Sequence, residues 1–148
     1  MSKIISTTKR AYLAGFLDGD GSIYVRLKPN NSYKFGFQVS PYIILFQSIK
    51  EKEKFSKICS IINCGYIRER NDGILEYTIN RKEEIIKFVK LVKPYLILKE
   101  KQAKLIISIL SKKEKVKNKD DFKELMELVE QFRSLNYSKK RKRHSLTP

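Results

Sequence analysis

The apolar residues change from a helical to a strand pattern twice along the chain, and this repeat limits the possible folds more than any other feature. Residues 8–18 have helical spacing, with Thr7 or Thr8 as the N-cap, and the glycine-rich segment 19–22 ends the helix. From Ile23 onward apolar and polar residues alternate, as in a strand with one buried face. A helix that leads directly into a hairpin is therefore expected.

A second helix and a second hairpin follow, and the turn at 71–73 joins the two strands of that hairpin. Two hairpins of similar build favour one antiparallel four-stranded sheet with helices on one face, in the order αββαββα with further C-terminal helices, which is an α+β fold. Pro41 indicates a bulge or an edge position, and Asp120 or Asp121 is expected to cap the last helix. The expected elements after the first strand are a turn at 29–32, a strand at 35–46, a helix at 48–62, strands at 66–70 and 74–80, and helices at 83–92, 99–110 and 122–135.

The charge of the chain indicates a polyanionic partner. Its 32 Lys and Arg residues against 16 Asp and Glu give a net charge of +16, for which nucleic acid is the first candidate and a merely soluble basic protein the alternative. A membrane partner is disfavoured, because no apolar run approaches a membrane span and no basic stretch has a broad apolar face. The basic run 139–143 is expected to contact phosphates, with a disordered or import-signal tail as the alternative. We expect one domain at 1–137 and a basic tail at 138–148.

Cysteine and histidine are too few for a disulfide framework or an ordinary zinc site. Cys59 and Cys64 have no second pair, and the single histidine is His144. A reduced, intracellular protein is expected. The richness in Lys, Ile and Asn indicates an A+T-rich genome, either in an organelle (a chloroplast or mitochondrion) or in a microbe whose cytoplasm would hold the protein.

The nonapeptide at 13–21, LAGFLDGDG, resembles the motif of the LAGLIDADG homing endonucleases, with six of nine positions identical. The resemblance continues through 28–35, 65–70 and 98–103 and covers most of the chain. It is to the single-motif, homodimeric type of that family. The helix and hairpin order inferred above is also the order that this family uses.

The glycines of the motif favour a close contact between two helices. Gly15 and Gly19 lie about one turn apart on one helix face, so a second helix can approach closely. A chain with one motif needs that helix from another copy, and a two-fold homodimer is expected. The expected interface residues are Tyr12, Gly15, Phe16 and Gly19.

Asp20 would then lie beside its symmetry mate, and two close carboxylates favour a divalent cation over mutual repulsion. Mg²⁺ is the expected ion, with Mn²⁺ or Ca²⁺ as substitutes for binding, and no small-molecule cofactor is expected. A calcium loop is excluded, because Ile23 and Pro29 stand where such a loop needs Gly and Glu. Asp20 as a simple turn residue at a helix end remains the alternative.

The resemblance implies hydrolysis of one phosphodiester per DNA strand across the minor groove, leaving 3′ overhangs. By that resemblance Asp20 and the Gly19 carbonyl would hold the metal, and Gln47 and Lys99 would order the water and stabilise developing charge. One position departs from the family pattern, since Glu51 stands where relatives carry a basic residue.

DNA recognition is expected on the sheet face turned away from the helices. Arg, Lys, Gln, Ser and Thr side chains gather there, and these are the side chains that read base edges in the major groove. An ordinary solvated sheet face is the alternative for this surface. An intron RNA-binding maturase and a non-cleaving DNA-binding protein are the alternatives for the function. The expected DNA-binding residues are Tyr24, Arg26, Lys28, Asn30, Ser32, Tyr33, Gln38, Ser40, Tyr42, Ile44, Arg68, Arg70, Glu76 and Thr78, with Ser138, Lys139, Lys140, Arg141 and Lys142 in the tail.

Overall fold

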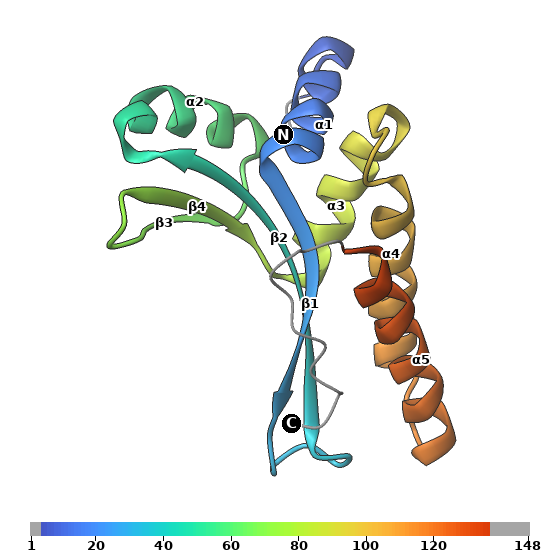
Figure 1. The fold of residues 1–148 in the computed structure, drawn as a ribbon. Coiled ribbons are helices and arrows are strands. Elements are labelled where there is room, and N and C mark those ends of the chain that lie inside the picture. The colour runs from blue at the N-terminus through green and yellow to red at the C-terminus, as the bar shows by residue number, and fades with distance from the viewer. Residues whose placement is uncertain (1–3, 137–148) are drawn as a thin grey trace.

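A computed structural model describes residues 4–136 and confirms the α+β fold (Figure 1). The tail predicted at 138–148, with its expected DNA contacts, lies outside the described residues. No helix in the described range is both long and apolar enough to cross a membrane. The elements in chain order are α1 (Thr7–Asp20), β1 (Gly21–Pro29), β2 (Phe37–Ser48), the 3-10 turn η1 (Ile49–Glu51), α2 (Lys52–Ile62), β3 (Tyr66–Glu69), β4 (Ile74–Ile79), α3 (Lys82–Val92), the 3-10 turn η2 (Lys93–Tyr95), α4 (Glu100–Glu114) and α5 (Lys119–Leu135).

The two hairpins pair into one antiparallel four-stranded sheet, as the sequence predicts, and the structure gives the strand order β1-β2-β4-β3. The sheet is strongly curved, and the helices lie on one side of it (Figure 1). Pro41 pairs with Val25 in continuous register, so no bulge forms there. The pairing of β2 with β4 begins only at Ile43, and Pro41 therefore lies on a locally free edge, where its missing N–H costs no ladder bond.

The core lies between the sheet and the helices. Alternate residues of β1, β2 and β4 face it, including Ile23, Ile43 and Ile79, each at most 1% exposed. The largest fully buried side chains from the helices are Phe55, Phe88 and Phe132 of α2, α3 and α5. This packing fixes the other sheet face outward and open.

Several predicted boundaries need correction. Ser6, and neither Thr7 nor Thr8, caps α1, because its Oγ accepts a hydrogen bond from the Lys9 N–H at 3.3 Å. The helix also runs two residues beyond the predicted end, to Asp20, where the Gly21 N–H donates to the Leu17 carbonyl.

The second strand and the helices α2 and α4 also begin or end at other residues than predicted. β2 begins at Phe37, because Gly36, with φ of 80°, and Phe35 form the turn, and Phe35 stacks on Phe122 of α5. α2 starts at Lys52 after the strand has continued to Ser48. α4 runs on to Glu114, into the segment expected to be a loop.

The cap of α5 lies two residues before the expected Asp120. Asn118 caps the helix through Oδ1, which accepts from the Asp121 N–H at 2.8 Å. Asp121 in return accepts from the Lys117 N–H at 3.0 Å. Asp121 thus stabilises the start of the helix through its own hydrogen bonds, but Asn118 is the capping residue.

Candidate functional site

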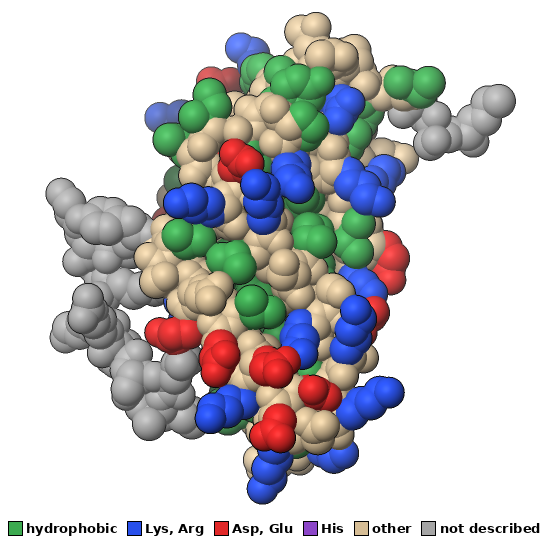
Figure 2. All heavy atoms as spheres, turned by 90° about the vertical axis from the view of Figure 1, so that its right-hand side faces the viewer, with side chains coloured by type: hydrophobic (Ala, Val, Ile, Leu, Met, Phe, Trp, Pro, Cys, Tyr) green, Lys and Arg blue, Asp and Glu red, His purple; other side chains and the backbone are tan. Residues whose placement is uncertain are grey.

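The outward face of the sheet carries the side chains predicted to bind DNA, and its strand positions hold one acidic residue, Glu76. Arg26 is exposed on β1, and Arg68 is exposed on β3. Figure 2 shows another side of the molecule, where Lys and Arg are interspersed with Asp and Glu. The helix α5 contributes five acidic residues, whereas the strand positions of the outward sheet face hold one.

Two arginines on this face are held by one carboxylate. Glu76 Oε2 accepts from Arg68 at 2.9 Å, and Oε1 accepts from Arg70 at 3.4 Å. Arg70 also donates to Asp72 at 2.5 Å. The Glu76 side chain is 13% exposed and Arg68 is 65% exposed, so a nearly buried anion fixes two cations that still face solvent. Guanidinium groups held in this way suit bidentate contacts to guanine.

A second group of side chains is built around Tyr42. Its ring stacks on Tyr24 at 5.1 Å between centroids, and the Arg26 guanidinium lies 5.7 Å from the ring centroid. The Lys28 Nζ donates to the Tyr42 hydroxyl at 3.3 Å. Burial raises the pKa of Tyr24 above its usual 10.0, which keeps its hydroxyl protonated and able to donate. The aromatic pair therefore orders two cations on the same face.

Two of the predicted DNA contacts are less accessible than expected. Ile44 and Thr78 lie on the outward face, but each is only 5% exposed. They are directly paired in the middle of a row that runs from Ser22 to Tyr66 across all four strands. Their neighbours cover them, so their side chains are poorly accessible to bases, and their contacts with DNA stay a prediction.

The remaining predicted contacts lie along β2 and at the tip of the first hairpin. Gln38 and Ser40 are half-buried on β2, and Ser32 and Tyr33 are exposed at the tip. Asn30 Oδ1 accepts from the backbone N–H of Ser32 at 3.0 Å and from its hydroxyl at 2.6 Å, which fixes the turn. These side chains thus extend the polar face to the far end of the hairpin.

Asp20 is the last residue of α1, and its side chain is exposed. Within residues 4–136 its carboxylate makes no hydrogen bond and no ion pair. The Gly19 carbonyl is one of the last four of the helix and has no intrahelical donor. A free carboxylate and an orphan carbonyl at the negative end of a helix are a hard, oxygen-rich environment that attracts cations.

The described part of one chain holds no complete metal site. No group of three or more His, Cys, Asp or Glu side chains in the described range is arranged to hold an ion. The donors at Asp20 and Gly19 fit Mg²⁺, which takes few carboxylates and keeps several waters. Any further protein ligands would have to come from outside residues 4–136 of this chain.

Gln47 and Lys99 lie at the same end of the sheet as Asp20. Gly21 pairs with Leu45, which places Gln47 just beyond the start of β1, and Gln47 Oε1 accepts from the Ser48 N–H at 2.8 Å. The Lys99 Nζ donates to the Asp18 carbonyl at 2.8 Å, two residues before Asp20. The three predicted catalytic residues are therefore brought to one end of the molecule.

Sequence reasoning missed the role of Asp18. Its carboxylate accepts hydrogen bonds from the backbone N–H groups of Ile97, Leu98 and Lys99. One sequence signal was available: Lys99 begins the helix predicted at 99–110, where a capping residue is needed, and its side chain cannot accept a capping bond.

Glu51 lies in η1 and is paired only loosely. Its Oε2 is 3.9 Å from the Lys54 Nζ, and both side chains are exposed. Lys52 is engaged elsewhere, in an ion pair with Glu69. Lys50 is exposed, and Lys50 and Lys54 are the cations nearest in sequence that could offset the charge of Glu51.

One face of α1 is open in the single chain. A Cβ added at Gly15 or Gly19 would meet no heavy atom within 4 Å. Tyr12, one turn before Gly15, is 54% exposed. Phe16 is half-buried and stacks on Phe55 of α2 at 5.9 Å, so it turns partly inward. The glycines therefore leave a shallow, unfilled surface beside an exposed aromatic ring.

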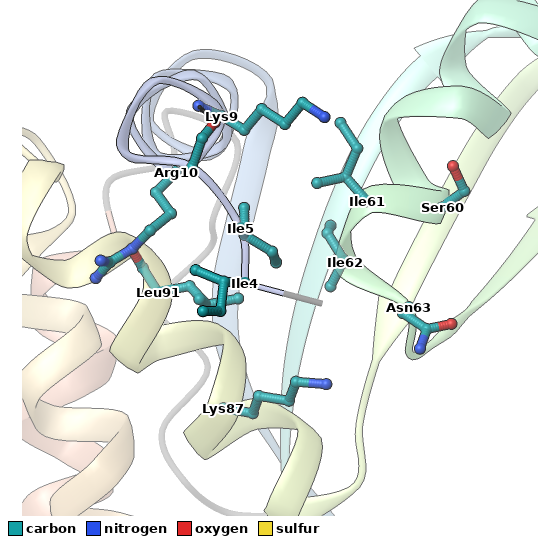
Figure 3. A pocket seen from close by; sticks show the side chains of 11 residues that line it. Ile4, Ile5, Lys9, Arg10, Ser60, Ile61, Ile62, Asn63, Lys87 and Leu91 are labelled. Atoms are coloured by element: carbon teal, nitrogen blue, oxygen red, sulfur yellow. Dashed lines mark hydrogen bonds between the residues drawn. The ribbon is translucent and has the colours of Figure 1, made fainter. Parts of the chain in front are cut away.

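A groove lies at the opposite end of α1 from Asp20. This groove of about 830 Å³ is formed by the segment before α1, the end of α2 and the side of α3 (Figure 3). Isoleucines and the stems of Lys9, Arg10 and Lys87 line it. It contains none of the predicted site residues.

The profile of the LAGLIDADG endonuclease family matches residues 13–110, and the chain belongs to this family. It is 38% identical over 137 residues to the DNA endonuclease I-CreI of Chlamydomonas reinhardtii, covering 92% of this chain and 83% of that protein. It is 33% identical over 133 residues to I-CvuI of Chlorella vulgaris, covering 90% and 83%. A crystal structure of I-CvuI with the I-CreI target and Mg, in which the DNA is not cleaved, has a TM-score of 0.84 at 32% identity, covering 91% of this chain and 86% of that one. Within the family, the chain is a single-motif homing endonuclease that resembles I-CreI.

Proposed function

We propose that this protein binds a long, pseudo-palindromic double-stranded DNA site as a homodimer and hydrolyses one phosphodiester per strand across the minor groove, leaving 3′ overhangs. The observation that carries the proposal is the unpaired, exposed carboxylate of Asp20 at the end of the open face of α1. The relatives named above are DNA endonucleases, and I-CvuI has been solved on DNA.

The dimer is proposed to form through α1. Two copies of its face can approach closely at Gly15 and Gly19, where each chain leaves space. Tyr12 and Phe16 would flank the contact. A two-fold axis at this contact brings the two Asp20 side chains together and aligns the two sheet faces along one duplex.

The sheet face is proposed to lie in the major groove. Arg26, Lys28, Arg68 and Arg70 would donate to guanine or to phosphates. Gln38 suits adenine, and Glu76 acts chiefly through the two arginines that it holds. Further contacts are proposed for Tyr24, Asn30, Ser32, Tyr33, Ser40 and Tyr42 on this face, and for Ser138, Lys139, Lys140, Arg141 and Lys142, which lie outside the described residues.

Mg²⁺ is the proposed ion, with Mn²⁺ or Ca²⁺ as substitutes for binding. Asp20 and the Gly19 carbonyl are proposed to hold it. A bound divalent ion supplies charge neutralisation at a phosphate and a water of lowered pKa. Gln47 is positioned to orient a water through its amide nitrogen, because its Oε1 is already engaged by Ser48. The Lys99 ammonium would stabilise negative charge that develops on the phosphate.

Glu51 is the observation that favours a second candidate, a DNA-binding protein that cleaves weakly or not at all. An exposed carboxylate at a position where relatives carry a cation would repel a scissile phosphate. An RNA-binding maturase on the same scaffold is the other alternative. The presence of Asp20, which a pure binder does not need, favours the nuclease.

The test is to incubate the protein with Mg²⁺ and a randomised duplex library and to sequence both the bound and the cut molecules. Cut ends with 3′ overhangs are expected. The Asp20→Asn variant should bind the selected site as tightly as the wild type and cut at least about a hundredfold more slowly, because a ligand to the ion is lost. The Asp120→Asn variant, with the same change at an exposed position of α5, should cut normally. Persistent cutting by Asp20→Asn would reject the metal assignment, and binding without cutting by the wild type would favour the second candidate.

A further inference from the structure

The carboxylate of Asp18 joins two distant parts of the chain. Its Oδ2 accepts from the N–H of Ile97 at 2.8 Å and of Leu98 at 3.1 Å, and its Oδ1 accepts from the N–H of Lys99 at 3.1 Å. The Lys99 Nζ returns a hydrogen bond to the Asp18 carbonyl at 2.8 Å. The last turn of α1 and the start of α4 are thus connected by four hydrogen bonds between residues about 80 positions apart.

Side-chain packing does little to hold the turn at 97–99. Ile97 is 84% exposed and Leu98 is 71% exposed, whereas Leu96 just before them is buried. Lys99 is the N-cap of α4 and makes no side-chain cap bond of its own. The backbone donors that precede α4 are therefore satisfied by a carboxylate from another helix, which also suits the positive end of α4.

The two aspartates of the motif consequently have different environments. Asp20 is exposed and has no partner within residues 4–136, whereas the Asp18 carboxylate is occupied by three N–H donors. Asp18 is therefore less available than Asp20 to a metal ion. These three bonds fix the backbone position from which the Lys99 side chain extends. The fourth bond holds the Lys99 ammonium against the carbonyl of Asp18, which precedes Asp20 by two residues.

We propose that Asp18 is a positioning residue that holds Lys99 beside the C-terminal end of α1, where Asp20 lies, by fixing the turn at 97–99. This inference rests on the proposed function, in which Lys99 stabilises charge on the reacting phosphate. Without the carboxylate the three N–H groups turn to water and the ammonium is no longer fixed. A displacement of about 1 Å at a catalytic group costs on the order of a hundredfold in rate.

The experiment is a double-mutant cycle in the full chain, measured by single-turnover cleavage of the selected DNA site. Asp18→Asn and Lys99→Met should each slow cleavage by about 10- to 100-fold, while the Kd for DNA in Ca²⁺ stays within about threefold of the wild type. If Asp18 acts through Lys99, the double variant cuts no more slowly than Lys99→Met alone. Asp120→Asn is again the matched control and should leave the cleavage rate unchanged, both in the wild type and in Lys99→Met.

Three outcomes are separable. Rate losses that multiply in the double variant overturn the inference about Asp18 and leave the proposed nuclease intact. A wild-type rate in Lys99→Met rejects the role of Lys99 and the inference with it. An unchanged rate in Asp18→Asn rejects the inference alone.

Amide hydrogen exchange distinguishes positioning from general unfolding. In Asp18→Asn one carboxylate oxygen is replaced by an NH2 group that cannot accept, so amide exchange should become faster in the turn at 97–99 and remain slow in the core strand β2. If Asp18→Asn does not fold, Asp18→Glu is the second variant, because it keeps the charge and shifts the turn. It should also cleave more slowly while it binds DNA with nearly wild-type affinity. Unchanged exchange at 97–99 in a folded variant with slow cleavage would contradict the proposed route.

Discussion

The substitution Gly15→Leu separates the stability of one chain from the assembly of two. In the single chain a side chain at this position meets open space, because no heavy atom lies within 4 Å of an added Cβ. Replacing a glycine inside a helix by leucine favours the helix by up to about 1 kcal/mol. The folded monomer should therefore be as stable as the wild-type chain or slightly more stable.

The proposed dimer should respond in the opposite direction. The two-fold axis places the substitution in the contact twice, and each overpacked side chain costs about 1–3 kcal/mol. The combined cost of about 2–6 kcal/mol raises the dimer Kd at least about thirtyfold. Cleavage at low protein concentration should fall with the loss of dimer, because in the proposed function the two chains share the metal site.

Sedimentation equilibrium over a range of protein concentrations measures the dimer Kd, and urea unfolding measures the stability. Ser108→Leu, which places the same side chain at an exposed position of α4, should leave the dimer intact. An unchanged dimer Kd in Gly15→Leu would refute the assignment of the α1 face. A large loss of stability in the monomeric variant would refute the claim that this face is open.

Three further predictions concern the sheet and the core. Tyr42→Phe keeps the stacked ring and removes the acceptor for Lys28, so DNA affinity should fall by about 1 kcal/mol, roughly fivefold, in a fluorescence anisotropy titration. Glu76→Gln removes the charge that holds Arg68 and Arg70, so a sequencing-based binding assay should show relaxed base preference with overall affinity retained. Burial raises the pKa of the Cys59 thiol from 9.0 to about 12, so the folded form keeps the proton while the unfolded chain loses it. Stability should be complete below pH 9 and fall as the pH rises from 9 towards 12, with a shallower fall in Cys59→Ala, as urea unfolding across that range would show.

Local patterns in the sequence predicted the sheet and the order of the elements. The period-2 alternation in β1, β2 and β4 correctly separated inward from outward residues, because one buried face imposes that period. It could not predict that Ile44 and Thr78 are covered on the outward face, because their burial depends on neighbours in the other strands. Alternation reports which face a residue is on, and the curvature and side chains of the whole sheet determine how much of it is accessible.

The C-terminal end of α1, with Asp18 and Asp20, shows even more clearly what local sequence patterns cannot predict. In the sequence Asp18 and Asp20 are two similar aspartates that flank Gly19, and nothing local separates their roles. The structure separates them because the partner of Asp18 is a turn about 80 residues later. The prediction of the α1 cap failed because Ser6, Thr7 and Thr8 are all good capping residues, and local sequence does not choose among them.

The central claim is that two chains meet through α1 and together hold a divalent ion between their Asp20 carboxylates on bound DNA. Anomalous diffraction from crystals of the protein–DNA complex grown with Mn²⁺ measures this directly. The account predicts anomalous peaks on the two-fold axis or symmetrically beside it, within about 2.0–2.3 Å of an Asp20 oxygen from each chain. Two Asp20 side chains that lie far apart, with Mn²⁺ bound elsewhere on the complex, would contradict it.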